Sequence, residues 1–307
     1  MQRCHIKIAH VFFILSFIAL LSCSSERPPM VDNGSYTKEM NDWCNKRIES
    51  LKDKNGWLSL AGLFWLKEGE NSFGSGESND IVFPAGKAPD QIGWLTLKER
   101  TVRVKINPGI NVSSENKPVT EMLLQSDAKE KPTVLAFGSL SWYIIERGDK
   151  FGIRLKDSEN PNLLEFKGIE RYPIDRAWRI AADFSPYDPP KKIPIQTVLG
   201  TTVEESSPGA LVFKIDGTSY RLDAIGEPDS KELFIVFGDK TNGIETYGAG
   251  RFLSADKPEK GKMTSIDFNK AYNPPCAFTE YATCPLPPSQ NKLPVKITAG
   301  EKKYGVL

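Results

Sequence analysis

The chain has 307 residues, of which 26% are charged, and its formal net charge is only +1. This near balance, without clusters of lysine and arginine, argues against a protein that binds nucleic acid. The length is enough for one large folded domain or two modest ones.

The first 22 residues are predicted to be a signal peptide. Arg3 and Lys7 give a basic start, and residues 11–21 form an apolar run, VFFILSFIALL. The run is shorter than the roughly 20 residues that a membrane-spanning helix needs, but it suits a signal peptide. The next residues, Leu20-Leu21-Ser22-Cys23, resemble the lipobox of bacterial lipoproteins, in which the cysteine becomes the first mature residue and is acylated. An ordinary secretory leader with a chance cysteine is the alternative.

The lipobox resemblance implies a protein of the bacterial cell envelope, held in the lipid bilayer by acylated Cys23. Ser24 after the cysteine favours delivery to the outer membrane. Residues 23–36 are polar and contain prolines, as expected of a tether. The leader contains two of the 40 basic residues and no acidic one, so 38 remain against 39 acidic residues.

Both histidines, His5 and His10, lie inside the predicted leader. The remaining chain therefore cannot build a Ser-His-Asp or Cys-His catalytic site, or a zinc site that uses histidine. Any acid–base chemistry must come from carboxylates, tyrosine, lysine or cysteine. We expect no metal and no cofactor.

Residues 37–54 are predicted to form a helix that lies on a sheet. Thr37 can cap its start, Asn55-Gly56 can end it, and apolar residues recur at three- and four-residue steps: Met40, Trp43, Cys44, Ile48 and Leu51. On this interpretation Cys44 is a packing residue rather than a reactive thiol.

After Gly56 the pattern predicts β-strands, with strict alternation in residues 101–107. The stretch EGENSFGSGESNDIVFP, residues 68–84, resembles the opening of a forkhead-associated β-sandwich. Ser75 stands where that family has its arginine, and residues 89–93, PDQIG, lack its serine and histidine. The resemblance therefore implies the shape of that sandwich but not its phosphothreonine binding. We assign residues 37–160 to the helix and this first β-unit.

Residues 161–307 are predicted to form a second β-unit. A strand is expected at 178–184, a hairpin at 211–222 with its turn at Asp216-Gly217, a central strand at 233–237 and another strand at 245–253. Strands without intervening helices favour antiparallel sheets. The predicted fold class is therefore all-β: two antiparallel sandwich or barrel-like units preceded by one short helix.

Three motifs of this second unit, TYGAGRFLSAD, IDFNKAYNPPCAFTEYATCPLPP and NKLPVKITAGEK, closely resemble the bacterial and archaeal family catalogued as domain of unknown function 1684. The resemblance is strongest over residues 172–302. It implies a shared fold and a shared pocket, but it supplies no reaction.

Cys276 and Cys284 lie eight positions apart in the second motif. A disulfide is one interpretation, since the expected compartment permits it. Two buried thiols among apolar neighbours are the second. A metal site is the third and weakest, because neither a histidine nor a further nearby cysteine is available.

Residues 267–288 are predicted to form a stiff loop over the sheet. Its five prolines fix φ and remove amide donors, so it cannot pair as an inner strand. Such a loop can be only a lid that closes one end of the β-unit. Rigid loops on β-scaffolds are also where binding sites are built.

The candidate site under this loop centres on Arg251, which follows the glycines of Tyr247-Gly248-Ala249-Gly250. Arginine among carboxylates and tyrosines can clamp a small polar or anionic ligand, although a structural Arg251–Asp267 pair explains it equally well. The ligand-binding candidates are Tyr247, Arg251, Asp267, Asn269, Tyr272 and Asn273. We therefore expect a ligand-binding or accessory envelope module. The alternative is a histidine-free hydrolase that uses a carboxylate pair such as Glu245 and Asp267.

Overall fold

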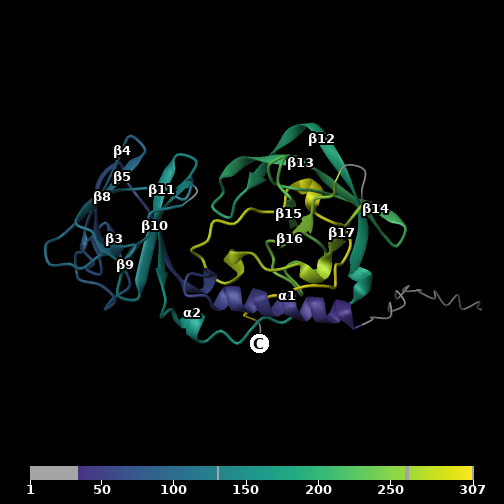
Figure 1. The fold of residues 1–307 in the computed structure, drawn as a ribbon, viewed down its shortest axis with the longest axis horizontal. Coiled ribbons are helices and arrows are strands. Elements are labelled where there is room, and N and C mark those ends of the chain that lie inside the picture. Colours follow the sequence, from purple (N-terminus) through teal and green to yellow (C-terminus); the bar gives the residue numbers. More distant parts are fainter. Residues whose placement is uncertain (1–33, 130, 260–262, 306–307) are drawn as a thin grey trace, which may run out of the picture.

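The computed structural model describes residues 34–129, 131–259 and 263–305. Two β-bodies lie side by side, and one helix runs along the second of them (Figure 1). The predicted fold class, mostly β with one N-terminal helix, is confirmed. The predicted leader, the acylation site Cys23 and the tether up to residue 33 lie outside the described residues. None of the described helices is long and apolar enough to span a membrane.

The first body, the sandwich, consists of two sheets. One has the order β1-β11-β10-β9-β6-β7, and the other β3-β2-β4-β5-β8. The strands of the first sheet are β1 (Leu60–Trp65), β6 (Ser113–Ser114), β7 (Lys117–Pro118), β9 (Leu135–Phe137), β10 (Leu140–Arg147) and β11 (Lys150–Asp157). Those of the second are β2 (Gly69–Gly74), β3 (Ile81–Val82), β4 (Gly93–Lys98), β5 (Thr101–Ile106) and β8 (Glu121–Leu124).

The core of the sandwich follows from side-chain alternation. In β5 every second residue is buried, and these are Val102, Val104 and Ile106. They meet the inner face of the opposite sheet, where Trp142 contacts Phe73 and Phe83 edge to face with ring centroids 5.9 and 5.3 Å apart.

The second body, the C-terminal body, is built around a curled four-stranded sheet in the order β14-β13-β12-β17. Its strands are β12 (Arg179–Gln196), β13 (Thr202–Ile215), β14 (Thr218–Asp223) and β17 (Thr264–Asp267). A separate pair, β15 (Glu232–Phe237) and β16 (Arg251–Asp256), packs against it around a shared apolar core. The predicted hairpin turn is confirmed, with φ of 50° at Asp216 and 77° at Gly217.

Two predicted strands differ from the structure. Residues 233–237 are buried as expected, but β15 pairs along its length with β16 alone, so it is not the centre of a larger sheet. The predicted strand 245–253 begins only at Arg251. Residues 239–250 instead form tight turns, in which the Asn242 side chain bonds to Asp239, Thr246 and Tyr247. These local hydrogen bonds replace the ladder that a strand requires.

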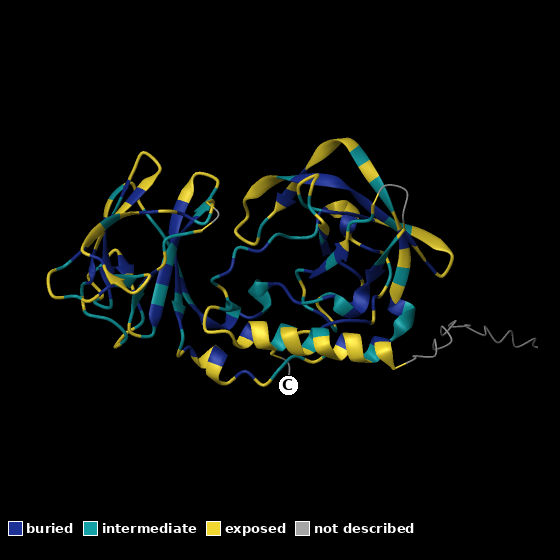
Figure 2. Ribbon diagram, viewed as in Figure 1, coloured by how far each residue is buried: buried dark blue, intermediate teal, exposed yellow. Residues whose placement is uncertain are grey.

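Helix α1 (Ser35–Lys52) starts two residues earlier than predicted, with Gly34 rather than Thr37 at its N-cap. It lies along the C-terminal body, with a mostly exposed outer face (Figure 2). Met40 and Leu51 are buried, whereas Cys44 is half-buried, and burial raises the pKa of its thiol. Cys44 is therefore held mainly in the unreactive protonated form. The remaining short helices are α2 (Pro161–Leu164), η1 (Trp57–Ser59), η2 (Arg176–Trp178), η3 (Phe268–Lys270), η4 (Pro275–Ala277) and η5 (Ser289–Asn291).

Candidate functional site

A polar cavity of about 280 Å³ lies between α1 and the C-terminal body. Six elements and their flanks form its walls: α1, the paired ends of β15 and β16, strand β17 with η3, and the start of β12. The lining residues are Glu39, Trp43, Arg179, Glu232, Ser254, Ala255, Asp256, Ser265, Asp267, Lys270 and Tyr272. Among the predicted site residues, Asp267 and Tyr272 line this cavity.

Asp267 is the most buried charged group of the cavity wall, with 6% of its surface exposed. Its two carboxylate oxygens accept hydrogen bonds from the Tyr36 hydroxyl at 3.0 and 2.9 Å. One of them also accepts bonds from the backbone and side-chain nitrogens of Asn269. Burial, and then the neighbouring Asp267 charge, raise the pKa of Tyr36, so its hydroxyl remains a donor. Asp267 is thereby fixed in position before any ligand arrives.

The charges around the cavity do not balance. Four carboxylates line it, from Glu39, Glu232, Asp256 and Asp267, against the two cations Arg179 and Lys270. Glu39 accepts hydrogen bonds from both cations, at 2.8 Å from Lys270 and 3.3 Å from Arg179, and its pKa is lowered chiefly by the Lys270 bond. The wall therefore has an excess of negative charge.

Glu232 and Asp256 supply the least compensated part of that charge. They are directly opposite each other in the β15–β16 register, and both are exposed. Like charges at such positions repel each other. Neither carboxylate takes part in an ion pair among the residues that the structure describes. A cationic group between them would relieve the repulsion.

Two aromatic side chains complete the wall. The rings of Trp43 and Tyr272 have centroids 6.4 Å apart. Arg47 lies over the Tyr272 ring at 4.7 Å, and Arg171 lies over the Trp43 ring at 5.1 Å. Burial raises the pKa of Tyr272, which therefore stays protonated. Stacking of these arginines on the two rings therefore holds the rings in position in the cavity wall.

Arg251, the centre of the predicted site, reaches neither this cavity nor Asp267. Its side chain is fully buried and donates to the Asp239 carboxylate at 2.8 Å. It also donates to the backbone carbonyls of Ile297, Ala299 and Glu301. Neither predicted arrangement, the shared cavity or the Arg251–Asp267 pair, is present. The turns of residues 239–250 bring Asp239 to the arginine instead.

The other candidate residues mostly form structural contacts. Asn269 supports Asp267, as described above. Asn273 donates from its backbone to the buried Glu301 carboxylate at 2.7 Å and from its side chain to the Lys302 carbonyl. The Tyr247 hydroxyl donates to the Cys276 carbonyl at 3.0 Å. Glu245 accepts from the Tyr172 hydroxyl at 2.9 Å and pairs with Lys296, so it does not meet Asp267.

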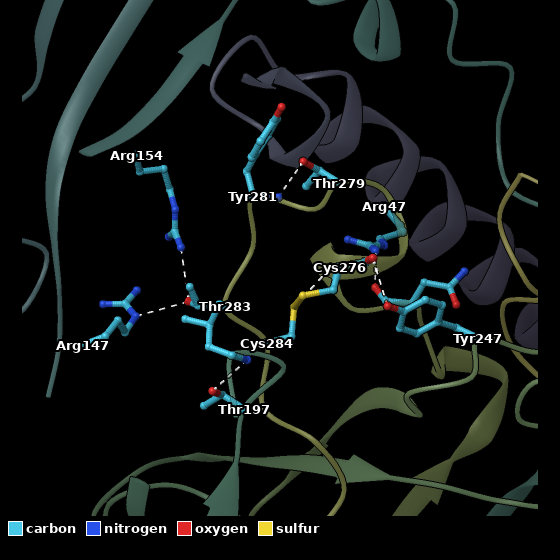
Figure 3. Close-up of a disulfide and its surroundings, with 12 residues drawn as sticks. Arg47, Arg147, Arg154, Thr197, Tyr247, Cys276, Thr279, Tyr281, Thr283 and Cys284 are labelled. Atoms are coloured by element: carbon cyan, nitrogen blue, oxygen red, sulfur yellow. Dashed lines mark hydrogen bonds between the residues drawn. A yellow bond between two sulfur atoms is a disulfide. The ribbon is translucent and has the colours of Figure 1, made fainter. Parts of the chain in front are cut away.

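Cys276 and Cys284 are joined by a disulfide, with their Cα atoms 6.2 Å apart. Figure 3 shows the bridge at the centre of the proline loop, with Tyr247 on one side and Thr283 on the other. Among the described residues, no three histidine, cysteine, aspartate or glutamate side chains form a group that could hold a metal ion.

The glycines before Arg251 serve close packing and line a second cavity. A Cβ atom on Gly250, whose φ is +92°, would approach the Pro287 side chain to 2.4 Å, so the loop itself occupies the space that this glycine clears. Gly248 has no such contact, because its nearest neighbour would lie at 3.7 Å. Both glycines border a cavity of about 640 Å³ beside the loop, and Lys240 and Lys292 also line it.

Apart from Glu39 and Trp43 of α1, the residues lining the cavity lie in the part of the chain that matches a known family. Residues 164–302 match the family described as "Protein of unknown function (DUF1684)". The solution NMR structure of an uncharacterized protein from gene locus rrnAC0354 of Haloarcula marismortui is 32% identical, and the match covers 45% of this chain and 77% of that one, with a TM-score of 0.38. Residues 164–302 of the chain are therefore a DUF1684 domain.

Two further structures match about 30% of this DUF1684 protein. The FhaA FHA domain complexed with the intracellular domain of Rv3910 is 16% identical, covering 31% of this chain and 97% of that one. An Rv0020c FHA structure is 17% identical, covering 30% and 89%. The TM-score is 0.22 for each. No curated protein matches the chain.

Much of the cavity wall comes from residues that sequence reasoning did not select. The sequence predicts Trp43 as one of the apolar packing residues of the helix. Tyr36, which holds the wall residue Asp267, falls in the predicted tether. Glu232 and Asp256 are 24 positions apart, and only the β15–β16 pairing brings them together. Glu232 begins β15 and Asp256 ends β16, so a prediction with the correct bounds of both strands could have placed the two carboxylates opposite each other.

Proposed function

We propose that this DUF1684 protein is a lipoprotein of the cell envelope whose cavity beneath α1 binds a small polar ligand with a positively charged group. The excess of carboxylates in the cavity wall carries the proposal. An anionic ligand is disfavoured, because Glu39 already engages both cations while Glu232 and Asp256 have no counter-ion among the described residues.

The other wall groups fit the same ligand class. Trp43 and Tyr272 present aromatic surface, which attracts cations. Ser254 and Ser265 present hydroxyls, and buried Asp267 presents a fixed carboxylate. Together these groups can recognise an ammonium group and hydroxyls, as in an amino sugar.

A hydrolase built on Glu245 and Asp267 finds no support in this arrangement. The two carboxylates hold different partners, Tyr172 for the first and Tyr36 for the second. Of the two, Asp267 alone lines the cavity beneath α1.

Binding of three matched sugars to the detergent-solubilised full-length protein tests the proposal. Glucosamine and glucuronate each differ from glucose at one functional group, so the three provide an ammonium, a neutral and a carboxylate ligand on the same ring. We expect calorimetry to show saturable binding of glucosamine, weaker binding of glucose and none of glucuronate. The double variant Glu232→Gln/Asp256→Asn should lose the preference for glucosamine, whereas Glu204→Gln at the exposed start of β13 should keep it. Preference for glucuronate, or a preference for glucosamine that survives the double variant, contradicts the proposal.

A further inference from the structure

The sandwich and the proline loop meet at two arginines (Figure 3). Arg154 projects from β11 and Arg147 from the end of β10, and both donate to the Thr283 hydroxyl oxygen at 3.3 Å. Ile153 and Leu155 on either side of Arg154 fill the sandwich core, so alternation directs Arg154 to the opposite face of the sheet. Thr283 of the C-terminal body and Trp57 contact Arg154 on this face, and only 3% of the Arg154 surface is exposed.

Arg154 has no carboxylate partner among the described residues. Its hydrogen bond goes to a neutral hydroxyl, and its Nε has no acceptor. The Trp57 ring lies 5.7 Å from the guanidinium carbon. Because a buried charge without an opposite charge is costly, this environment is incomplete for an arginine.

The neighbouring charges increase that imbalance. Arg147 is already committed to Asp127 through two hydrogen bonds at 2.9 and 2.8 Å. Lys156, the next residue on the same face of β11, has its pKa lowered by burial and then by the positive charge of Arg154. Three cations therefore lie near this point of the sheet, where Asp127 pairs with Arg147 and the charge of Asp53 acts on Lys156. Neither carboxylate pairs with Arg154.

We propose that Arg154, Arg147 and Thr283 form a binding site for an oxyanion, either a phosphate or a carboxylate group. A guanidinium presents paired N–H donors in the geometry of such groups. The Thr283 hydroxyl can rotate to donate to the anion, since it acts only as an acceptor here. The bound oxyanion would supply the missing counter-charge and connect the sandwich to the disulfide loop. This site is separate from the cavity beneath α1 and has the opposite charge.

Thermal unfolding of the detergent-solubilised full-length protein tests the site, with inorganic phosphate, acetate and chloride compared at equal ionic strength. A ligand that binds only the folded state raises Tm with concentration. We expect phosphate or acetate, but not chloride, to raise Tm. A rise with phosphate alone identifies a phosphoryl ligand, and a rise with both identifies oxyanions in general.

Variants locate the effect. Arg154→Met should abolish the anion-dependent rise and, in chloride, should unfold at or above the wild-type Tm, because the unpaired charge has gone. Thr283→Val should weaken the anion-dependent rise in Tm. If Arg154→Met does not fold, the Thr283 variant alone tests the location of the site. Arg103→Met, which removes an exposed arginine of β5, should keep the full rise. The proposal is overturned if neither anion shifts the wild-type Tm, if the rise persists in Arg154→Met, or if the rise is undiminished in Thr283→Val.

Discussion

Arg251 shows how completely a buried cation can be used for structure. Its guanidinium binds Asp239 and three carbonyls within residues 297–301, so it fastens the end of the described chain to β16. Asp239 in turn accepts bonds from the Thr241 hydroxyl and from the backbone amides of Thr241 and Ile297. These contacts commit both groups to structure, although the Arg251 Nε has no acceptor among the described residues.

Asp239→Asn is therefore expected to destabilise the protein by about 3–5 kcal/mol, because Arg251 would remain buried without its counter-charge. Urea unfolding monitored by tryptophan fluorescence measures the change. Asp229→Asn, an exposed substitution, provides the control. A loss below about 1 kcal/mol would show that Arg251 does not depend on this pair.

Tyr36→Phe is expected to change the pH dependence of stability. Because the pKa of Tyr36 is higher in the folded protein than its ordinary value of 10.0, its contribution is fully present below pH 10.0 and is lost as the pH rises further. The variant should be less stable at neutral pH by about 1.5–3 kcal/mol, the value of a hydrogen bond to a charged group. It should also lose less stability than the wild type between about pH 10 and 11. The free energy of unfolding is measured by urea unfolding at several pH values. If it falls equally steeply with pH in the variant and the wild type over this range, the prediction is wrong.

At the scale of elements, local patterns predicted local structure well. The alternation of residues 101–107 predicted the buried face of β5. Asp216-Gly217 predicted the hairpin turn between β13 and β14. The site was predicted less well, because its contacts link distant segments. The partners of Arg251 depend on how residues 239–250 turn, and the Tyr36–Asp267 bond joins residues 231 positions apart. No local pattern contains that information.

The disulfide loop gives a prediction at this scale. Replacing Cys276 and Cys284 with alanine should lower the free energy of unfolding by about 2–3 kcal/mol, since the bridge restricts the unfolded chain over a short loop. Cys44→Ala, which removes the third described cysteine, should lower the free energy of unfolding less. Because it keeps the disulfide, dithiothreitol should destabilise it as it destabilises the wild type. Identical unfolding of the wild type with and without dithiothreitol would mean that the bridge contributes nothing.

At the scale of the whole molecule, a small apolar cluster joins the two bodies, and α1 is fastened to the second of them. Arg47 in α1 donates to the buried Glu301 carboxylate at 3.2 Å and to the Asn273 carbonyl at 3.0 Å. The cluster joins Trp57 and Leu60, at the start of the sandwich, to the C-terminal body through Val236, Phe252, Ala282 and Cys284. The lipid anchor predicted at Cys23 would precede α1 by only a short stretch of chain.

The full-length protein is therefore expected to enter the detergent phase in Triton X-114 separation, and Cys23→Ala should remain in the aqueous phase. Acylation of Cys23 adds the apolar chains that insert into detergent micelles. Cys44→Ala controls for loss of a thiol as such. Mass spectrometry that shows an unmodified mature N-terminus at another residue would refute the anchor.

The position of α1 also sets an order on folding. Its partners Asp267 and Glu301 follow Tyr36 and Arg47 by 231 and 254 positions, so they emerge from the ribosome long after the helix does. An isolated helix of 18 residues is only marginally stable in water. Contacts between such distant residues carry a high loop-closure entropy and form late. The first described element of the chain is therefore expected to be among the last to reach its final place. A chain that ends before residue 267 would lack Asp267 and Glu301, the carboxylates that bind Tyr36 and Arg47.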